Sequence, residues 1–472
     1  MLVYPNQRWL KEDLTTTWNL TPYTMCLLSA MIRDLVEVKI VDAQFYGLSR
    51  EDFKKELEKF QPDLVGVSLL SSEYASIGDM AIADIKEVNK KTLIIAGGVH
   101  ITTNYERVMQ NKNIDYAMRG EGEYVLPALI KHLNGEGPAP TEGLVIRKSD
   151  GTLEVLPQAF VQDLDALPLP AYDMIDYKKY TMTVPRYGLD APTVLPFARF
   201  PTTRGCPVGC TFCQVGTIAG TRIRMRSPAN VMKELEYLKE NYGIKFFMFE
   251  DDNAFFYKQR TMELLRLMVD SGLDMKWKAT GVFLPTADED MFKLMAASGC
   301  EMINVAIESG TERVLKKVIQ KPLDLNLIPK KIALAQKHGL FVVTNFIIGL
   351  PSETWSEIRQ SLKYAETCGA DYVKIFNAIP LVGTKMYDMA KEGKYIVGDE
   401  TTVDQRYSVM RGSDYDPKDL NILRVYEWDR INFTDPIKRA KTAKMMNISE
   451  EELDRIRLAT RRALKFTEDA DC

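Results

Sequence analysis

The first 135 residues alternate short apolar runs with longer segments of helical periodicity. Runs such as Leu64–Val67 and Leu93–Ala96 have the length of buried strands, and each precedes a segment with apolar residues every three or four positions. Ser49 is a suitable N-cap for one such segment, which we expect to end near Phe60. The expected strands are 2–4, 38–41, 64–67, 93–96 and 114–118, and the expected helices are 21–35, 49–60, 77–88, 105–109 and 123–133. This alternation predicts an α/β domain with a doubly wound, Rossmann-like parallel sheet.

A different pattern follows between residues 141 and 196. Two short apolar runs flank Ser149–Asp150–Gly151, which is a hairpin signal. Residues 163–196 are rich in proline and aromatic residues without a period, so we expect a linker laid over a surface.

Strand and helix alternate again from residue 197 to about residue 395. The expected strands are 197–203, 246–250, 276–280, 302–307, 341–348 and 372–378. Six such units fit a partial (β/α)6 barrel of the TIM type, in which the chemistry lies at the carboxyl ends of the strands. The rest of the chain is charged and helical, and Ser449 with Glu452 forms a capping box for a final helix. The predicted domains are therefore 1–140, 141–196, 197–395 and 396–472.

Composition narrows the class of partner. The formal net charge is -4 with 27% charged residues, so no basic excess points to nucleic acid. No run of about 18 apolar residues occurs, and the N-terminus lacks a secretory signal pattern. We therefore expect a cytoplasmic protein that acts on a small molecule, without a membrane partner.

Three of the seven cysteines lie within eight residues, at Cys206, Cys210 and Cys213. Thiolates suit iron–sulfur sites, and three ligands leave one iron of a 4Fe–4S cluster open for a chelating molecule. A structural zinc site would require a fourth cysteine or histidine nearby, and none follows before Cys300. The spacing therefore predicts a 4Fe–4S cluster at the carboxyl end of the first barrel strand.

At these residues the chain resembles the radical S-adenosylmethionine (SAM) superfamily, including Phe212 before the last cysteine. The resemblance implies that the three cysteines ligate three irons and that SAM binds the fourth. Reduction of SAM would then yield methionine and a 5′-deoxyadenosyl radical. The resemblance continues at the later strand ends and implies SAM contacts from Asp251, Asp252, Asn253, Glu308, Ser309, Ile347, Gly349 and Pro380.

Structural explanations exist for several of these residues. Asp251 or Asp252 could cap the following helix, and Glu308 could be a cap as well. The glycine and proline at residues 349–351 could be present only because they form a turn.

The strand ends of the first domain carry short motifs at the edge where open α/β sheets bind ligands. They resemble the cobalamin-binding motif D-x-H-x-x-G, S-x-L and G-G, with Gln44 where the histidine should be. That histidine is the lower ligand of cobalt, so the resemblance implies cobalamin without a histidine ligand or a domain that binds none. The implied cobalamin residues are Asp42, Gln44, Gly47, Ser68, Leu70, Gly97, Gly98 and Glu121.

Two classes of reaction follow from the resemblance. In a methyltransferase, one SAM methylates cobalamin and a second SAM generates the radical, so that an unactivated substrate carbon receives the methyl group. The alternative is a non-methylating radical oxidoreductase, dehydratase or epimerase. Either reaction requires an electron donor such as flavodoxin or ferredoxin. The sequence identifies neither catalytic side chains nor the substrate.

Other candidate residues have structural explanations. We expect Cys300 and Cys368 to be core residues and His100 to be part of a loop. The segment from Glu427 to Phe433 places two aromatic residues among charges. We expect it either to cover the open side of the partial barrel and line the substrate cavity, or to be a helical cap that packs on the barrel.

Overall fold

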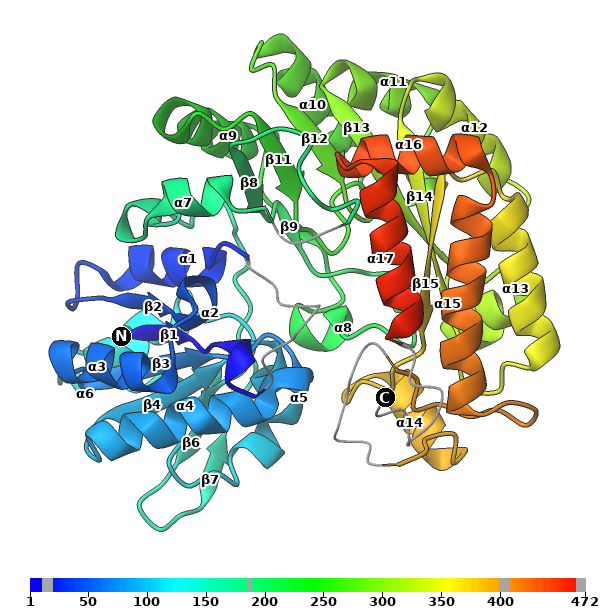
Figure 1. The fold of residues 1–472 in the computed structure, drawn as a ribbon. Coiled ribbons are helices and arrows are strands. Elements are labelled where there is room, and N and C mark those ends of the chain that lie inside the picture. Colours follow the sequence, from blue (N-terminus) through cyan, green and yellow to red (C-terminus); the bar gives the residue numbers. More distant parts are fainter. Residues whose placement is uncertain (11–19, 185–187, 399–406, 464–472) are drawn as a thin grey trace. The chain divides into compact units, whose positions relative to one another are not determined.

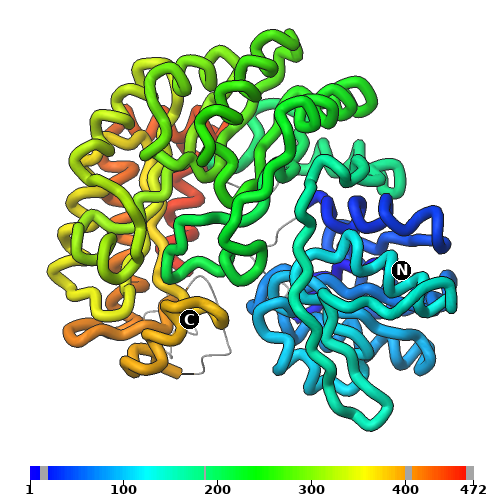
Figure 2. Tube along the Cα trace, turned by 180° about the vertical axis from the view of Figure 1, so that it is seen from behind, coloured from blue at the N-terminus to red at the C-terminus, as the bar shows by residue number. Residues whose placement is uncertain are grey.

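A computed structural model describes residues 1–10, 20–184, 188–398 and 407–463. Contacts within the chain divide it into two compact units, each of which is described by itself (Figures 1 and 2). The N-terminal unit contains Met1–Pro185 and the short segment Val215–Arg226. The barrel unit contains Arg186–Gln214 and Ser227–Cys472. The predicted domain boundaries stay predictions.

A seven-stranded sheet forms the centre of the N-terminal unit, in the order β2-β1-β3-β4-β5-β6-β7. The first five strands are parallel, and β6 and β7 extend the sheet as an antiparallel hairpin, as the pattern around Gly151 predicted. The bounds are β1 (Leu2–Tyr4), β2 (Ile40–Asp42), β3 (Leu64–Ser68), β4 (Leu93–Gly97), β5 (Tyr116–Met118), β6 (Leu144–Arg147) and β7 (Leu153–Val155). The predicted doubly wound sheet is confirmed.

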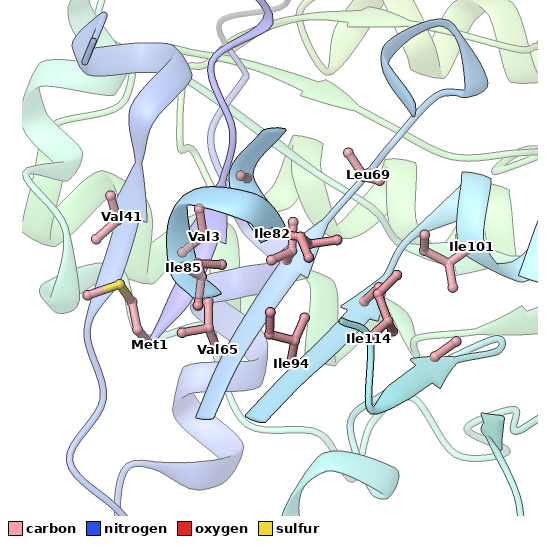
Figure 3. Close-up of a cluster of buried hydrophobic side chains, with 14 of the residues drawn as sticks. Met1, Val3, Val41, Val65, Leu69, Ile82, Ile85, Ile94, Ile101 and Ile114 are labelled. Carbon is pink, nitrogen blue, oxygen red and sulfur yellow. The ribbon is translucent and has the colours of Figure 1, made fainter. Parts of the chain in front are cut away.

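Helices cover both faces of this sheet. α3 (Arg50–Phe60), α4 (Ala75–Val88) and α5 (Val99–Val108) pack on the face that carries Val3, Val65 and Ile94 (Figure 3). α1 (Tyr23–Ile32) and α6 (Val125–Leu133) pack on the opposite face. α5 begins six residues before the predicted helix at 105–109, because the glycine pair ends β4 and the helix starts directly after it. His100 therefore lies in the first turn of a helix, and the prediction of a loop was wrong.

The segment predicted as a surface linker contains ordered and buried structure. It includes a 3-10 turn at Tyr172–Met174 and the helix α7 (Tyr177–Met182). Tyr172, Tyr177 and Tyr180 are buried, so the aromatic residues are internal rather than exposed. A six-residue helix is too short for its periodicity to stand out in the sequence.

Six parallel strands form the sheet of the barrel unit, in the order β15-β14-β13-β12-β11-β8. Their bounds are β8 (Phe197–Phe200), β11 (Phe246–Phe249), β12 (Lys276–Ala279), β13 (Cys300–Glu308), β14 (Phe341–Ile348) and β15 (Tyr372–Asn377). The helices between and after them are α9 (Pro228–Tyr242), α10 (Lys258–Asp270), α11 (Glu289–Ala297), α12 (Ile328–Lys337), α13 (Trp355–Thr367) and α14 (Lys385–Glu392). The strands follow one another in chain order, as a partial (β/α)6 barrel requires.

Side chains alternate between the two faces of this curved sheet. Phe247 packs on Phe200 and Trp277 on the helix-covered face, and Phe346 contacts Tyr364 of α13 on the same face. On the inner face, Met302, Val343 and Tyr372 join a hydrophobic cluster that closes the bottom of the barrel. Cys300 and Cys368 are buried, which confirms that both belong to the core.

The C-terminal helices pack against the last strand. They are α15 (Pro417–Phe433), α16 (Pro436–Met446) and α17 (Glu450–Arg462), and Ser449 caps the last of them as predicted. Asn432 of α15 accepts a hydrogen bond from Val373 N at 2.7 Å and donates to Val373 O at 2.8 Å. One buried amide thus pairs with the free edge of β15, so this segment packs on the last strand of the barrel. In the described part of the chain, no helix is long and apolar enough to span a membrane.

We predict that Asn432→Ala lowers the free energy of unfolding by about 2–4 kcal/mol, because the N–H and C=O of Val373 would be left buried without partners. Thr434→Ala removes an exposed hydroxyl bond to Arg430 O at the same helix end and serves as the control. Denaturant unfolding of the two variants provides the comparison. Equal stability would show that the edge of β15 does not depend on this amide.

Candidate functional site

The three clustered cysteines lie in one loop at the carboxyl end of the first barrel strand. After β8 the chain passes through β9 (Thr203–Arg204) and enters the loop at Gly205, whose φ of 87° suits glycine. Thr211 N donates to Ile319 O at 2.9 Å, and Thr211 Oγ1 donates to Val318 O at 2.7 Å. Gln214 Nε2 donates to Val382 O at 2.8 Å. The loop is therefore fixed by segments that follow the fourth and sixth barrel strands.

The two aspartates after β11 hold the entrance of this loop. Asp251 Oδ1 accepts hydrogen bonds from the backbone N–H groups of Thr202 and Thr203, and from their hydroxyls at 3.2 and 2.7 Å. Asp252 Oδ2 accepts from Gly205 N at 3.0 Å. Burial raises the pKa of Asp251 to about 6. These bonds are not helix caps, because both carboxylates accept from the backbone that precedes Cys206.

Asn253 lies next to the first cysteine. Its Nδ2 is 3.5 Å from Cys206 Sγ, and its Oδ1 is buried without a hydrogen-bond partner in the described part of the chain. Burial raises the pKa of the Cys210 thiol to about 12, and the charges of Lys321, Glu308 and the other two cysteines also act on it. Over the described residues, no three His, Cys, Asp or Glu side chains converge on one ion. A cluster in which each thiolate binds a different iron does not require such convergence.

Glu308 ends β13 in an unusual backbone conformation. Its φ is 73°, and the register with β14 shifts between Ala306 and Glu308. Left-handed backbone at a non-glycine residue costs free energy and is concentrated at functional sites. The Glu308 carboxylate is 2.9 Å from Lys321 Nζ, and both side chains are less than a tenth exposed.

Lys321 is a residue that the sequence reasoning missed. Its ammonium also donates to Ala306 O at 2.7 Å, so it fixes both the bulge and the carboxylate. Nothing in the sequence links it to Glu308, because a π-helix (Val314–Ile319) and a left-handed turn at Gln320 separate the two residues. A basic residue just after a helix is ordinary, and only the fold brings it to the cysteine loop.

The remaining SAM candidates lie at or near the ends of the last three barrel strands. Ser309 Oγ is 2.9 Å from Ser361 Oγ, so this side chain faces α13. Ile347 lies on the inner face of β14, and Pro380 follows β15 and is buried. Gly349 has φ 82° and donates its N–H to Glu353 Oε2 at 2.8 Å, and a Cβ there would lie 2.4 Å from Leu420. Glycine at this turn is thus required by backbone shape and close packing.

A belt of polar side chains lines the inner face of the barrel above the hydrophobic bottom. We call it the polar belt, and it consists of Asp190, Arg199, Glu250, Asn304, Asn345 and Lys374. Arg199 pairs with Glu250 at 2.9 Å, and Lys374 pairs with Asp190 at 3.0 Å. The carboxylate side chains of Glu250 and Asp190 are 37% and 47% exposed, so both keep acceptors open to solvent. The Oδ1 atoms of Asn304 and Asn345 are buried without a hydrogen-bond partner in the described chain.

The strand ends of the N-terminal unit bring several predicted cobalamin residues together. Leu69 N donates to Gly97 O at 2.9 Å, and His100 N donates to Leu69 O at 3.2 Å. A Cβ on Gly98, whose φ is 105°, would lie 2.4 Å from Leu69 O. The S-x-L loop with Ser68 and Leu70 and the glycine pair thus form one tight edge, and Leu70 is 39% exposed there.

His100 lies beneath this edge. Its Nδ1 is 2.9 Å from Ser72 Oγ, and the side chain is buried. Burial lowers the pKa of His100 to about 4, so the imidazole is neutral at physiological pH.

The D-x-Q-x-x-G segment forms a short helix, α2 (Ala43–Tyr46), that ends at Gly47 with φ 63°. Asp42 caps the helix by accepting from Phe45 N at 2.9 Å, and it accepts a second bond from Tyr180 OH at 2.9 Å. Gln44 is 1% exposed, and its Oε1 accepts from Gln7 N at 2.8 Å. Burial raises the pKa of Asp42 to about 6. The polar groups of this segment are therefore engaged with the protein.

Glu121 forms a buried ion pair with Arg224. The guanidinium donates two bonds of 2.6 Å to the carboxylate, and Val161 N donates to it at 2.7 Å. The side chains of Arg224 and Glu121 are 5% and 10% exposed. Because Arg224 belongs to the segment that begins two residues after Cys213, Glu121 fixes this segment to the N-terminal unit.

Comparison with known proteins identifies both halves of the chain. Residues 200–365 match the radical SAM superfamily, and residues 16–130 match the B12 binding domain. An uncharacterized methyltransferase of Pyrococcus horikoshii is 30% identical over 83% of this chain and 82% of its own length. The cytidylyl-2-hydroxyethylphosphonate methyltransferase of Streptomyces wedmorensis is 31% identical over 73% of this chain and 70% of its own length.

Solved structures show the same fold. OxsB, a cobalamin-dependent SAM radical enzyme crystallised with aqua-cobalamin and SAM, superposes with a TM-score of 0.73 at 16% identity. That alignment covers 98% of this chain and 72% of OxsB. The methyltransferase TsrM of Kitasatospora setae, with cobalamin and a 4Fe–4S cluster bound, gives 0.66 at 19% identity, over 84% of this chain and 76% of TsrM.

We predict that Asp251→Ala lowers the iron content after anaerobic reconstitution severalfold. It also lowers the free energy of unfolding by about 2–4 kcal/mol, because two buried N–H groups lose their acceptor. Asp251→Asn retains an oxygen at the same position and should bind iron as the wild type does. Iron analysis and thermal unfolding of both variants check this. Wild-type iron content in Asp251→Ala would contradict the assigned role.

We predict that Glu121→Ala lowers the free energy of unfolding by about 3–5 kcal/mol, because it leaves the Arg224 guanidinium buried without its counter-ion. Asp173→Ala breaks the pair with Arg33, whose side chains are 56% and 43% exposed, and should cost at most about 1 kcal/mol. Chemical unfolding of the two variants measures the difference. Equal losses would mean that the Glu121 pair is no stronger than an ordinary surface pair.

Proposed function

This chain belongs to the cobalamin-dependent radical SAM methyltransferases, and from that membership we propose that it methylates an unactivated carbon of a small polar molecule. The enzyme uses a 4Fe–4S cluster, SAM and cobalamin. When bound, the cluster supplies the electron that cleaves SAM to a 5′-deoxyadenosyl radical, and cobalamin supplies the methyl group. The observation that carries the proposal is that one chain joins the fixed cysteine loop to a B12-binding sheet edge.

The residues around the cysteine loop fit a cluster with SAM. Cys206, Cys210 and Cys213 are the proposed ligands, and Asp251 and Asp252 fix the backbone that leads into their loop. The donor set consists of three thiols and no fourth ligand within the loop, which suits a cluster with one open iron. Asn253 lies beside Cys206, and its buried Oδ1, which has no partner among the described residues, supplies an acceptor at the same place.

Glu308 and Lys321 suit the amino acid end of SAM. SAM carries an ammonium and a carboxylate, and a carboxylate–ammonium pair offers one partner to each. We propose that Glu308 accepts from a cationic or hydroxyl group of SAM and that Lys321 holds Glu308 in position. Glu308 has a left-handed backbone of the kind concentrated at functional sites, and its charge acts on Cys210 in the cysteine loop. Ile347, Gly349 and Pro380 are proposed to line the rest of the SAM site.

The B12-binding edge has glycines that suit a bound cobalamin and, among the described residues, no histidine placed to bind cobalt. A Cβ at Gly47 would meet nothing within 4 Å and one at Gly97 only Met118 at 3.8 Å, so both leave room for close approach, and Ser68 and Leu70 lie at the same edge. Gln44 stands where an imidazole would bind cobalt, and His100 is bonded to Ser72. We therefore propose that cobalt has no histidine below it.

The polar belt supports a small polar substrate. Its exposed carboxylates, and the amide oxygens that lack a partner among the described residues, are acceptors that a substrate with hydroxyl or amino groups would satisfy. We propose a cytoplasmic location, with flavodoxin or ferredoxin as the electron donor and neither nucleic acid nor a membrane as a partner.

The direct test uses SAM with a trideuterated methyl group. The anaerobically reconstituted enzyme, with cobalamin and a reductant, is given a small-molecule cell extract, with cytidylyl-2-hydroxyethylphosphonate as the first pure compound to assay. We expect 5′-deoxyadenosine and a product in which one hydrogen is replaced by the deuterated methyl group. Cys210→Ala should give neither. Formation of 5′-deoxyadenosine with an altered but unlabelled product would favour the non-methylating oxidoreductase, dehydratase or epimerase instead.

We predict that Glu308→Ala weakens SAM binding by about 10- to 100-fold, the range expected for loss of one hydrogen bond to a charged group. The iron content should stay at the wild-type level, because Glu308 lies outside the cysteine loop. Equilibrium binding of SAM to the reconstituted protein gives the affinity. Unchanged affinity would leave Glu308 as a structural partner of Lys321 alone.

A further inference from the structure

The partner of Asp42 comes from α7, which the sequence pattern did not reveal. Tyr180 OH donates to Asp42 Oδ2 at 2.9 Å, and both side chains are almost completely buried. The Tyr180 ring stacks on Phe45 with centroids 3.7 Å apart and planes 20° apart. Tyr180 therefore contacts the carboxylate that begins α2 and an aromatic ring within it.

The second polar side chain of this segment is also turned inward. Gln44 accepts from Gln7 N in the turn after β1, and it is 1% exposed. β1 lies between β2 and β3, and the chain order of the sheet reverses between β1 and β3. Ligands of open α/β sheets bind outside the carboxyl ends of the strands at such a reversal. The D-x-Q-x-x-G segment thus lies at the sheet edge where a ligand would bind, while its polar side chains form hydrogen bonds within the protein.

A carboxylate that orients a metal ligand must be available to that ligand. An imidazole that binds a metal donates its other N–H to a carboxylate or carbonyl, which fixes the ring. Asp42 is the carboxylate in this segment, and its oxygens already accept from Tyr180 OH and Phe45 N.

We propose that Tyr180 is a positioning residue for the lower face of cobalamin, because it occupies Asp42 and thereby holds the D-x-Q-x-x-G segment without a protein ligand to cobalt. This inference rests on the proposed function, since it requires that cobalamin binds at this edge. The consequence is that a histidine at residue 44 is insufficient for ligation while Tyr180 retains Asp42.

The test compares Tyr180→Phe, Gln44→His and the double variant, each as the full chain reconstituted with hydroxocobalamin. Absorbance titration gives the cobalamin affinity, and electron paramagnetic resonance of the cobalt(II) form detects an axial nitrogen. Tyr177→Phe removes a buried phenol oxygen from the same helix, leaves the Asp42 contact in place and serves as the matched control.

We expect Tyr180→Phe to weaken cobalamin binding by about tenfold, because binding would then have to order the D-x-Q-x-x-G segment that Tyr180 no longer holds, and Tyr177→Phe to bind as the wild type does. Nitrogen splitting should be absent in Gln44→His and present in the double variant, where Asp42 is free to orient the imidazole. Equal splitting in Gln44→His and the double variant, or none in a double variant that binds cobalamin, would overturn the role of Tyr180. Wild-type affinity in Tyr180→Phe would overturn it as well.

The two hypotheses fail in different ways. If the wild type itself binds no cobalamin, the proposed function fails before Tyr180 is tested. If the wild type and the variants bind cobalamin alike, only the inference about Tyr180 fails. Thermal unfolding of each variant identifies one that has lost its fold, in which case the affinities of Tyr180→Phe and Tyr177→Phe decide the outcome.

Discussion

The cysteine loop depends on buried carboxylates at the end of the neighbouring strand. Asp251 accepts from two successive backbone N–H groups and Asp252 accepts from a third, so the chain enters the loop in one fixed path. The cost of burying Asp251 is visible in its raised pKa, and the hydrogen bonds offset that cost. Three thiolates on a short loop can serve one cluster only if the backbone between them keeps its shape.

The same device recurs in the N-terminal unit. Asp42 ends β2, accepts from a backbone N–H of the next turn and has a pKa raised by burial. In both units a buried aspartate at the end of a parallel strand turns a flexible connection into a rigid edge. Each of these strand ends is thus fixed by bonds from a buried carboxylate to the backbone.

Much of the fold could be predicted from the sequence, because it depends on local periodicity. Both ends of β14, whose apolar run is long, were predicted correctly. The capping residues Ser49 and Ser449 marked the starts of their helices. The prediction of a surface linker at residues 163–196 was wrong, because α7 is short and its buried tyrosines do not recur with a helical period. Glu121 stays a predicted cobalamin residue, and the sequence did not reveal that its carboxylate pairs with Arg224 and accepts from Val161 N. Lys321 and Tyr180 were missed, since their partners are distant in the sequence and only tertiary structure brings them together.

The central claim is that one chain carries both an iron–sulfur cluster and cobalamin. Elemental analysis of the full chain, purified anaerobically after reconstitution with iron, sulfide and hydroxocobalamin, tests it most directly. The account predicts about four irons per chain, the content of one 4Fe–4S cluster, together with about one cobalt. Iron at that level without cobalt would contradict the account, because the N-terminal unit would then be a B12-binding fold without its cofactor.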